Sequence, residues 1–162
     1  MLLGLISDTH GLLRPEIFEL FKGVDHIIHA GDLGGIELLT ELQAMAPVTC
    51  VWGNTDGWDV REAVPEVADV KIGDLRVVVM HGQQLGSPTP KGVAAAYPGA
   101  DLVVFGHSHK PGIERVGSVL AVNPGSAGPR RFQLPVTVAM ASWEGGKLSA
   151  RLLPVLKNPS WA

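Results

Sequence analysis

Five short apolar segments of the chain each end, within a residue or two, at an Asp, Asn or His. They are LLGLISDTH, HIIHAGDL, VTCVWGNTD, LRVVVMHG and LVVFGHSH. Short apolar segments bounded by Gly are typical of buried strands. Because the ligand sites of α/β folds lie beyond the carboxyl ends of the strands, the pattern predicts that these polar side chains meet at one edge of a sheet.

The first half of the chain is predicted to alternate strands and helices. We expect strands over residues 1–7, 25–30 and 48–52, and helices over 15–22 and 35–45. Pro15 suits the first turn of one helix and Gly23 a cap after it, while Pro47 ends the other helix.

The second half is predicted to contain mostly strands. Gly73-Asp74 has the chemistry of a hairpin turn between extended runs at 67–72 and 75–80. A helix over 91–97 and a strand over 101–105 come next, followed by strands at 113–116, 119–122, 136–142 and 147–153. We therefore expect an α/β fold, in which two mixed β-sheets pack as a sandwich flanked by helices and form a single domain over residues 1–162.

Composition narrows the setting of this fold. Hydrophobic residues make up 46% of the chain, yet no apolar run approaches the roughly 20 residues needed to span a bilayer. The first residues lack the features of a signal peptide, and the only cysteine, Cys50, lies in an apolar run typical of the core. We therefore expect a cytoplasmic protein that does not enter membranes.

The charge of the chain limits its partners. A net charge of −3 provides no basic field for strong nucleic-acid binding. An anionic substrate would therefore be attracted by local chemistry, and homo-oligomer formation is left open.

Seven side chains that follow the apolar segments have the chemistry of metal ligands: Asp8, His10, Asp32, Asn54, His81, His107 and His109. Carboxylates and neutral imidazoles that share a small space bind divalent cations, because the cation cancels carboxylate repulsion. Alternation along an extended chain puts the two side chains of Asp8-x-His10 on the same side. Taken singly, each His is more often a core residue and each Asp or Asn a turn residue, but five motifs in order favour a two-metal site.

The expected charge of this site indicates its chemistry. Two divalent ions and two aspartates leave a charge of about +2, which attracts anions. A water held between the ions becomes hydroxide near neutral pH, so we expect hydrolysis of a phosphate ester. Without thiolate ligands, manganese, iron, cobalt, nickel and zinc all suit the site, and manganese is our preferred ion.

The ordered motifs resemble the signature of the calcineurin-like metallophosphoesterases: Asp8-Thr9-His10, Gly31-Asp32, Gly53-Asn54, His81-Gly82 and Gly106-His107-Ser108-His109. The short length, the Gly53-Asn54-Thr55-Asp56 variant and the segment 123–126 make the chain most similar to the small bacterial and archaeal phosphodiesterases of that superfamily. The resemblance implies a sandwich of two sheets flanked by helices, with two metal ions at one edge.

The resemblance also implies roles for single residues. Asp8, His10, Asp32 and His109 would hold the first ion, and Asp32, Asn54, His81 and His107 the second. Asp32 would bridge the two ions, and Asp32, Asn54 and His81 would take part in catalysis. His29 matches a structural position and stays outside the ligand set.

One departure from the family pattern affects the mechanism. Many members carry a His directly after the Asn of the Gly-Asn motif, where it protonates the leaving group, but this chain has Thr55 followed by Asp56. Good leaving groups should therefore react and poor ones lag. A turn residue is the favoured interpretation of Asp56.

The substrate is the least determined part of the prediction. Trp52 and Trp58 suit either base stacking or loop anchoring. Arg130 and Arg131 suit either a phosphate clamp or a solvated pair. Our hypothesis is a metal-dependent phosphodiesterase that acts on a small anionic phosphate ester with a hydroxide between two metal ions as nucleophile. The alternatives are a phosphomonoesterase and a metal-binding scaffold without turnover, because the same subfamily resembles a scaffold subunit of the eukaryotic retromer coat.

Overall fold

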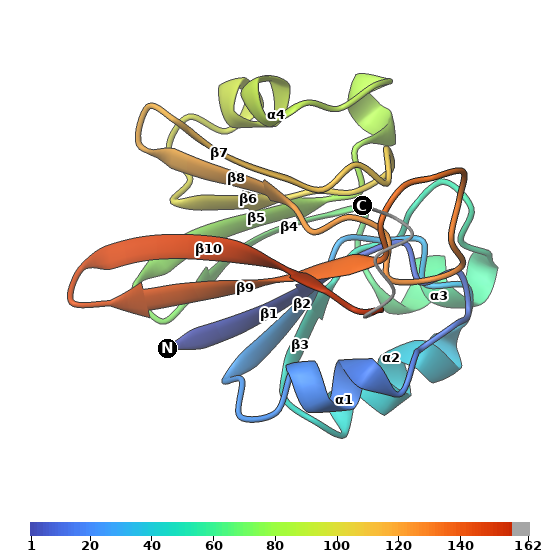
Figure 1. The fold of residues 1–162 in the computed structure, drawn as a ribbon. Helices are drawn as coiled ribbons and strands as arrows, with labels where there is room; N and C mark the ends of the chain where they lie inside the picture. Colours follow the sequence, from blue (N-terminus) through green and yellow to red (C-terminus); the bar gives the residue numbers. More distant parts are fainter. Residues whose placement is uncertain (157–162) are drawn as a thin grey trace.

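Two five-stranded β-sheets face each other in the computed structural model, which describes residues 1–156 (Figure 1). In the first sheet, the order is β10 (Lys147–Pro154), β9 (Thr137–Glu144), β1 (Leu2–Ile6), β2 (His26–His29) and β3 (Val48–Cys50). In the second sheet, the order is β4 (Val67–Ile72), β5 (Leu75–Met80), β6 (Leu102–Val104), β8 (Val119–Asn123) and β7 (Gly112–Val116). Both sheets are mixed, which confirms the predicted fold class.

Parallel strands in each sheet direct their carboxyl ends to a common edge. β1 pairs in parallel with β2, and β2 with β3, while β9 runs antiparallel to both β1 and β10. In the second sheet, β5, β6 and β8 are parallel, and β4 and β7 run antiparallel to their neighbours. The loops that follow β1, β2, β3, β5 and β6 carry the predicted ligands.

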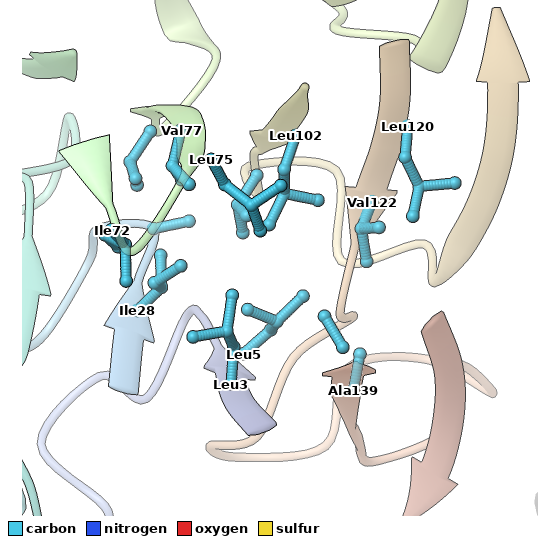
Figure 2. Close-up of a cluster of buried hydrophobic side chains, with 14 of the residues drawn as sticks. Leu3, Leu5, Ile28, Ile72, Leu75, Val77, Leu102, Leu120, Val122 and Ala139 are labelled. Atoms are coloured by element: carbon cyan, nitrogen blue, oxygen red, sulfur yellow. The ribbon is translucent and has the colours of Figure 1, made fainter. Parts of the chain in front are cut away.

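The core between the sheets consists of aliphatic side chains from both (Figure 2). Leu3 and Leu5 of β1 point into it, because alternate residues of a strand face the same side. From the opposite sheet, Leu102 and Val122 lie fully buried against them. Full burial of such a side chain contributes roughly 1.5–3 kcal/mol, so this layer holds the two sheets together.

Helices cover the outer faces of the sandwich (Figure 1). α1 (Glu16–Leu20) and α2 (Ile36–Gln43) pack on the first sheet, with Ile17, Phe21 and Leu42 fully or almost fully buried. Gly4 of β1 admits the Phe21 ring, because an added Cβ would lie 3.1 Å from it. α4 (Pro90–Ala96) covers the second sheet through Val93.

Two short elements were not predicted from the sequence, namely α3 (Trp58–Ala63) and the 3₁₀ helix η1 (Gln83–Leu85). In α3 only Val60 is buried, so the segment lacks the repeated apolar positions that indicate a helix. The other predicted elements are present, with ends that differ by at most two residues. The single-domain assignment over 1–162 stays a prediction, and its last six residues lie outside the described part.

Cys50 is buried, as expected, and burial raises the pKa of its thiol. Among residues 1–156, no helix is long and apolar enough to cross a membrane.

The layer between the sheets can be tested with Leu102→Ala. Leu102 is 0% exposed, so its truncation should lower the free energy of unfolding by about 2–5 kcal/mol, as measured by urea denaturation. Leu152→Ala, at a 37% exposed position of the edge strand β10, is the matched control and should cost less than about 1 kcal/mol. Equal losses in the two variants would contradict the assignment of the core.

Candidate metal centre

The structure places all seven predicted ligands in loops at one edge of the sandwich. The loop after β1 carries Asp8 and His10, the loop after β2 carries Asp32, and the loop after β3 carries Asn54. The loop after β5 carries His81, and the loop after β6 carries His107 and His109. Backbone hydrogen bonds tie these loops together, since the N–H of Asp8 donates to the carbonyl of Gly31 and the N–H of His10 to that of Asp32, both at 3.0 Å.

The backbone at this edge is strained. Six non-glycine residues of the described chain have a left-handed φ, and five of them are predicted ligands: Asp8 (56°), His10 (46°), Asp32 (57°), His107 (73°) and His109 (60°). The left-handed conformation costs an L-residue roughly 1–2 kcal/mol. Such strain persists where surrounding contacts over-determine it, and it clusters at functional sites. The strain therefore marks five of the seven positions that the sequence motifs indicate.

Each aspartate uses one oxygen for hydrogen bonds and leaves the other facing the cluster. Oδ2 of Asp8 accepts hydrogen bonds from the Ser7 hydroxyl at 2.7 Å and from the His107 N–H at 3.3 Å. Oδ1 of Asp8 has no hydrogen-bond partner. In the same way, Oδ1 of Asp32 accepts from the Thr55 N–H at 3.0 Å, which leaves Oδ2 directed at the histidines.

Imidazole nitrogens surround these two free oxygens. Oδ1 of Asp8 lies 3.3 Å from Nε2 of His109, 3.7 Å from Nε2 of His81 and 3.8 Å from Nε2 of His10. Oδ2 of Asp32 lies 3.0 Å from Nε2 of His81 and 3.8 Å from Nε2 of His10. Two ligands bound to one ion at about 2.1 Å lie about 3.0–4.2 Å apart, according to the angle between their bonds. The donor spacing therefore suits divalent cations.

Two groups of donors are compact enough to hold an ion. Asp8, His10 and His109 form one, and Asp8, Asp32 and His81 form the other, with ligand atoms within 4.8 Å of one another in each. The first group contains three of the four residues predicted for the first ion. The second contains Asp32 and His81, two of the four residues predicted for the second ion, together with Asp8, which was predicted only for the first ion.

The other two predicted ligands, Asn54 and His107, lie beside the second group. Oδ1 of Asn54 is 3.1 Å from Nδ1 of His107, and the His107 ring meets the His81 ring edge-on at 5.2 Å between centroids. The structure thus brings all seven side chains together, although metal binding by each of them stays a prediction.

Unsatisfied polar atoms indicate what the cluster is built to hold. Nε2 of His10, Nε2 of His81, Nδ1 of His109 and Oδ1 of Asp8 are buried and make no hydrogen bond. Leaving such an atom unpaired costs about 1–3 kcal/mol. Nδ1 of His81 lies 2.8 Å from the carbonyl of Ala30, which can only accept, so Nδ1 carries the hydrogen and Nε2 is the ligand atom of the neutral ring. These residues therefore fit a divalent metal.

The electrostatics of the cluster agree with this interpretation. Burial alone would raise the pKa of Asp32, but His81 and the Thr55 N–H lower that pKa well below its usual range. Burial would also raise the pKa of Asp8, but His109 and His81 lower it, so that the pKa lies below its usual value. Although burial disfavours the charged form of His81, Asp32 and Asp8 raise its pKa. Both carboxylates are therefore ionised at neutral pH, and a cation would compete with a proton for His81.

His29 contacts the loops that carry the ligands and does not belong to either donor group. Its Nδ1 accepts a hydrogen bond from the Gly31 N–H at 3.1 Å, so the neutral ring carries its hydrogen on Nε2 and donates it to the Thr9 hydroxyl at 3.0 Å. Thr9 donates in turn to the carbonyl of Leu33 at 2.9 Å. This chain of hydrogen bonds joins the loops after β1 and β2, in keeping with the place of His29 outside the predicted ligand set.

Asp56 joins the loops after β2 and β3. Its carboxylate accepts hydrogen bonds from the Gly34 N–H at 3.0 Å and from the Gly53 N–H at 2.9 Å. The side chain is 4% exposed. These contacts are those of a turn residue, which is the interpretation favoured from the sequence.

Asn123 and Ser126 are supporting residues that sequence reasoning noted only through the resemblance. The Asn123 amide donates to the carbonyl of Gly106 and to the Ser108 hydroxyl, and its oxygen accepts from the Gly125 N–H. The Ser126 hydroxyl donates to the carbonyl of Asp8 at 3.0 Å. Asn-Pro-Gly-Ser reads as a turn in the sequence, so these long-range contacts had no separate signal.

The aromatic and basic residues near the site differ in exposure. The guanidinium of Arg61 lies 4.2 Å from the centre of the half-buried Trp52 ring, which indicates that Trp52 anchors its loop. Trp58 is 74% exposed at the start of α3. Thr55, Arg130 and Arg131 are exposed.

The His29 network predicts an acid sensitivity of stability. Burial lowers the pKa of His29 from 6.5 to about 4. Between these pH values the unfolded chain binds a proton that the folded chain does not, so the contribution of neutral His29 is present above pH 6.5 and is lost as the pH falls toward 4. It should amount to about 3 kcal/mol in total.

His29→Gln should remove this part of the pH dependence. Urea unfolding of both proteins between pH 4 and 6.5, with a chelator present, should give a slope that is shallower in the variant by roughly 1 kcal/mol per pH unit. The remaining histidines are common to both proteins, so the difference isolates His29. Parallel pH profiles would refute this role.

Comparison with known proteins places the chain in a family. The model of the calcineurin-like phosphoesterase superfamily domain matches residues 1–146. A "Probable metallophosphoesterase" from Methanothermobacter thermautotrophicus is 37% identical over 160 residues, which cover 94% of this chain and 92% of that protein. A phosphodiesterase from Methanocaldococcus jannaschii is 31% identical over 142 residues, which cover 77% of this chain and 83% of that protein.

A solved structure shares the fold over nearly the whole chain. The structure of an archaeal phosphodiesterase superposes with a TM-score of 0.74 at 27% identity, and covers 94% of this chain and 100% of that one. The match to the family model and the similarity to these proteins lead to one conclusion. The chain belongs to the calcineurin-like phosphoesterase superfamily.

Proposed function

We propose that this protein is a metal-dependent phosphodiesterase that hydrolyses a small anionic phosphodiester in the cytoplasm, with two divalent ions at its site. The observation that carries the proposal is the cluster of buried donor atoms without hydrogen-bond partners, gathered around the free oxygens of Asp8 and Asp32. Similarity to a phosphodiesterase of Methanocaldococcus jannaschii and to the solved structure of an archaeal phosphodiesterase supports the diester as substrate. Manganese is the proposed ion, chosen among the five divalent metals that N and O ligands without thiolate suit.

Asp32 is the proposed bridge between the ions. Its Oδ2 lies 3.8 Å from Nε2 of His10, which belongs to the first donor group, and 3.0 Å from Nε2 of His81, which belongs to the second. Asp8, His10 and His109 would complete the first ion site. Asn54, His81 and His107 would complete the second.

When bound at these residues, two divalent ions would supply an acidified water as nucleophile and would offset the charge of the phosphate. The chain's own contribution is to hold the ligands in place before the substrate arrives. The Thr55 N–H fixes Asp32, and the carbonyl of Ala30 fixes the ring of His81. Such outer contacts set the tautomer and the direction of each ligand.

The proton supply at the site favours diesters with good leaving groups. Thr55 stands where many family members have a histidine, and the Asp56 carboxylate is occupied by two backbone N–H groups. Neither residue is therefore placed to protonate a leaving alkoxide. A phosphomonoester brings a second negative charge to the phosphoryl group, so we expect it to react more slowly.

The direct test is hydrolysis of bis-p-nitrophenyl phosphate beside p-nitrophenyl phosphate, with metal-free protein titrated with manganese. We expect manganese-dependent cleavage that is faster for the diester. Asp32→Asn should lose on the order of 100-fold or more in kcat/KM, since it weakens the charge that both ions share. Asp74→Asn, in the exposed hairpin turn between β4 and β5, is the matched control and should retain activity.

Four results would contradict the proposal. Preference for the monoester would indicate a phosphatase. No turnover of either ester despite bound manganese would indicate a binding scaffold. Full activity after exhaustive chelation, or in a correctly folded Asp32→Asn protein, would rule out the proposed role of the metal.

A further inference from the structure

A pocket of about 560 Å³ opens beside His107, outside the donor cluster. One wall is the loop 86–90, which leads from η1 to α4, and the other is formed by residues 107–108 and 110–112 after β6. Phe105 and Asn123 also line it. Small-molecule pockets in proteins measure about 300–1,000 Å³, so this one has room for more than a phosphate group.

The walls of the pocket are rigid and largely apolar. Pro88, Pro90 and Pro111 line it, and a proline ring fixes its own φ. Phe105 is 1% exposed and packs in the cluster between the second sheet and α4, so it cannot turn away. Flat apolar faces that are fixed before binding suit a planar ring, because little side-chain entropy is lost on contact.

The polar groups of the pocket are few, and one of them is charged. Lys110 is the charged residue of the lining, and within residues 1–156 its ammonium group makes no hydrogen bond or ion pair. The Ser108 hydroxyl accepts from the Asn123 amide and from the Lys110 backbone N–H, which leaves its own hydrogen free to donate. These groups can orient an oxygen-bearing ring.

His107 connects this pocket with the metal centre, since it lines the pocket and its Nδ1 lies 3.1 Å from Oδ1 of Asn54. A phosphate held at the donor cluster would therefore place one of its ester groups at the mouth of the pocket. We infer that the pocket binds a ring-bearing ester group of nucleoside size and that Lys110 determines specificity for it, an inference that rests on the proposed function.

Gly112 offers a way to fill the pocket without disturbing the fold. It begins β7 and lines the pocket, and a Cβ added there meets no atom within 4 Å. Its backbone is outside the left-handed region. The side chain in Gly112→Leu can therefore occupy the space that the ring-bearing group needs.

The test measures binding, so that turnover is not required. The dissociation constants of thymidine 5′-monophosphate and ethyl phosphate are measured by calorimetry on the manganese-loaded protein. Both ligands carry the same phosphate, and only the first carries a ring-bearing group. The wild type should bind thymidine 5′-monophosphate at least about 10-fold more tightly. Gly112→Leu and Lys110→Met should each remove most of this preference and change the affinity for ethyl phosphate less than about 2-fold.

Lys147→Met, at an exposed lysine of the remote strand β10, is the matched control and should behave like the wild type. Equal affinity of the wild type for the two ligands, binding of neither, or variants that keep the full preference would overturn the inference. A wild type that binds as expected but fails to hydrolyse bis-p-nitrophenyl phosphate would contradict the proposed function alone, and would leave the binding result standing.

Discussion

The burial of two ionised carboxylates at one edge of the sandwich is the constraint on which the rest of the site depends. Asp8 is 0% exposed and Asp32 is 3% exposed, and burying a charge is costly unless it is compensated. One oxygen of each is compensated by hydrogen-bond donors, which are the Ser7 hydroxyl and the His107 N–H for Asp8 and the Thr55 N–H for Asp32. The other oxygens face imidazoles, so that neutral donors and negative charges together form a site that a divalent cation would complete.

The fold meets this constraint through parallel strands and strained loops. Strands of both sheets end at the same edge, and the loops that follow turn at once through left-handed residues such as Asp8 and His107. Gly106 allows a close approach between loops, because a Cβ there would overlap the Ser7 hydroxyl and the Asp8 carboxylate. The aliphatic layer between the sheets supports this geometry, since it fixes the positions from which the loops start.

Much of the fold could be predicted from the sequence because strands and ligands share a local pattern. An apolar segment followed by Asp, Asn or His locates a strand end, and five such ends place the candidate ligands together. Contacts between the loops, in contrast, have no local pattern in the sequence that would predict them. The pairing of Asn54 with His107 and the hydrogen bonds of His29 and Asn123 depend on residues far away in the chain. The helix α3 was also not predicted, because it buries only Val60 and so lacks the repeated apolar positions of a helix.

We propose that Asp32 is shared by two metal ions, and anomalous diffraction from crystals soaked in manganese would locate these ions. If Asp32 is shared, the map should contain two manganese peaks per chain, about 3.5–4 Å apart, with the Asp32 carboxylate bound to both and with His10 and His81 on different ions. A single peak, or two peaks of which only one contacts Asp32, would contradict it.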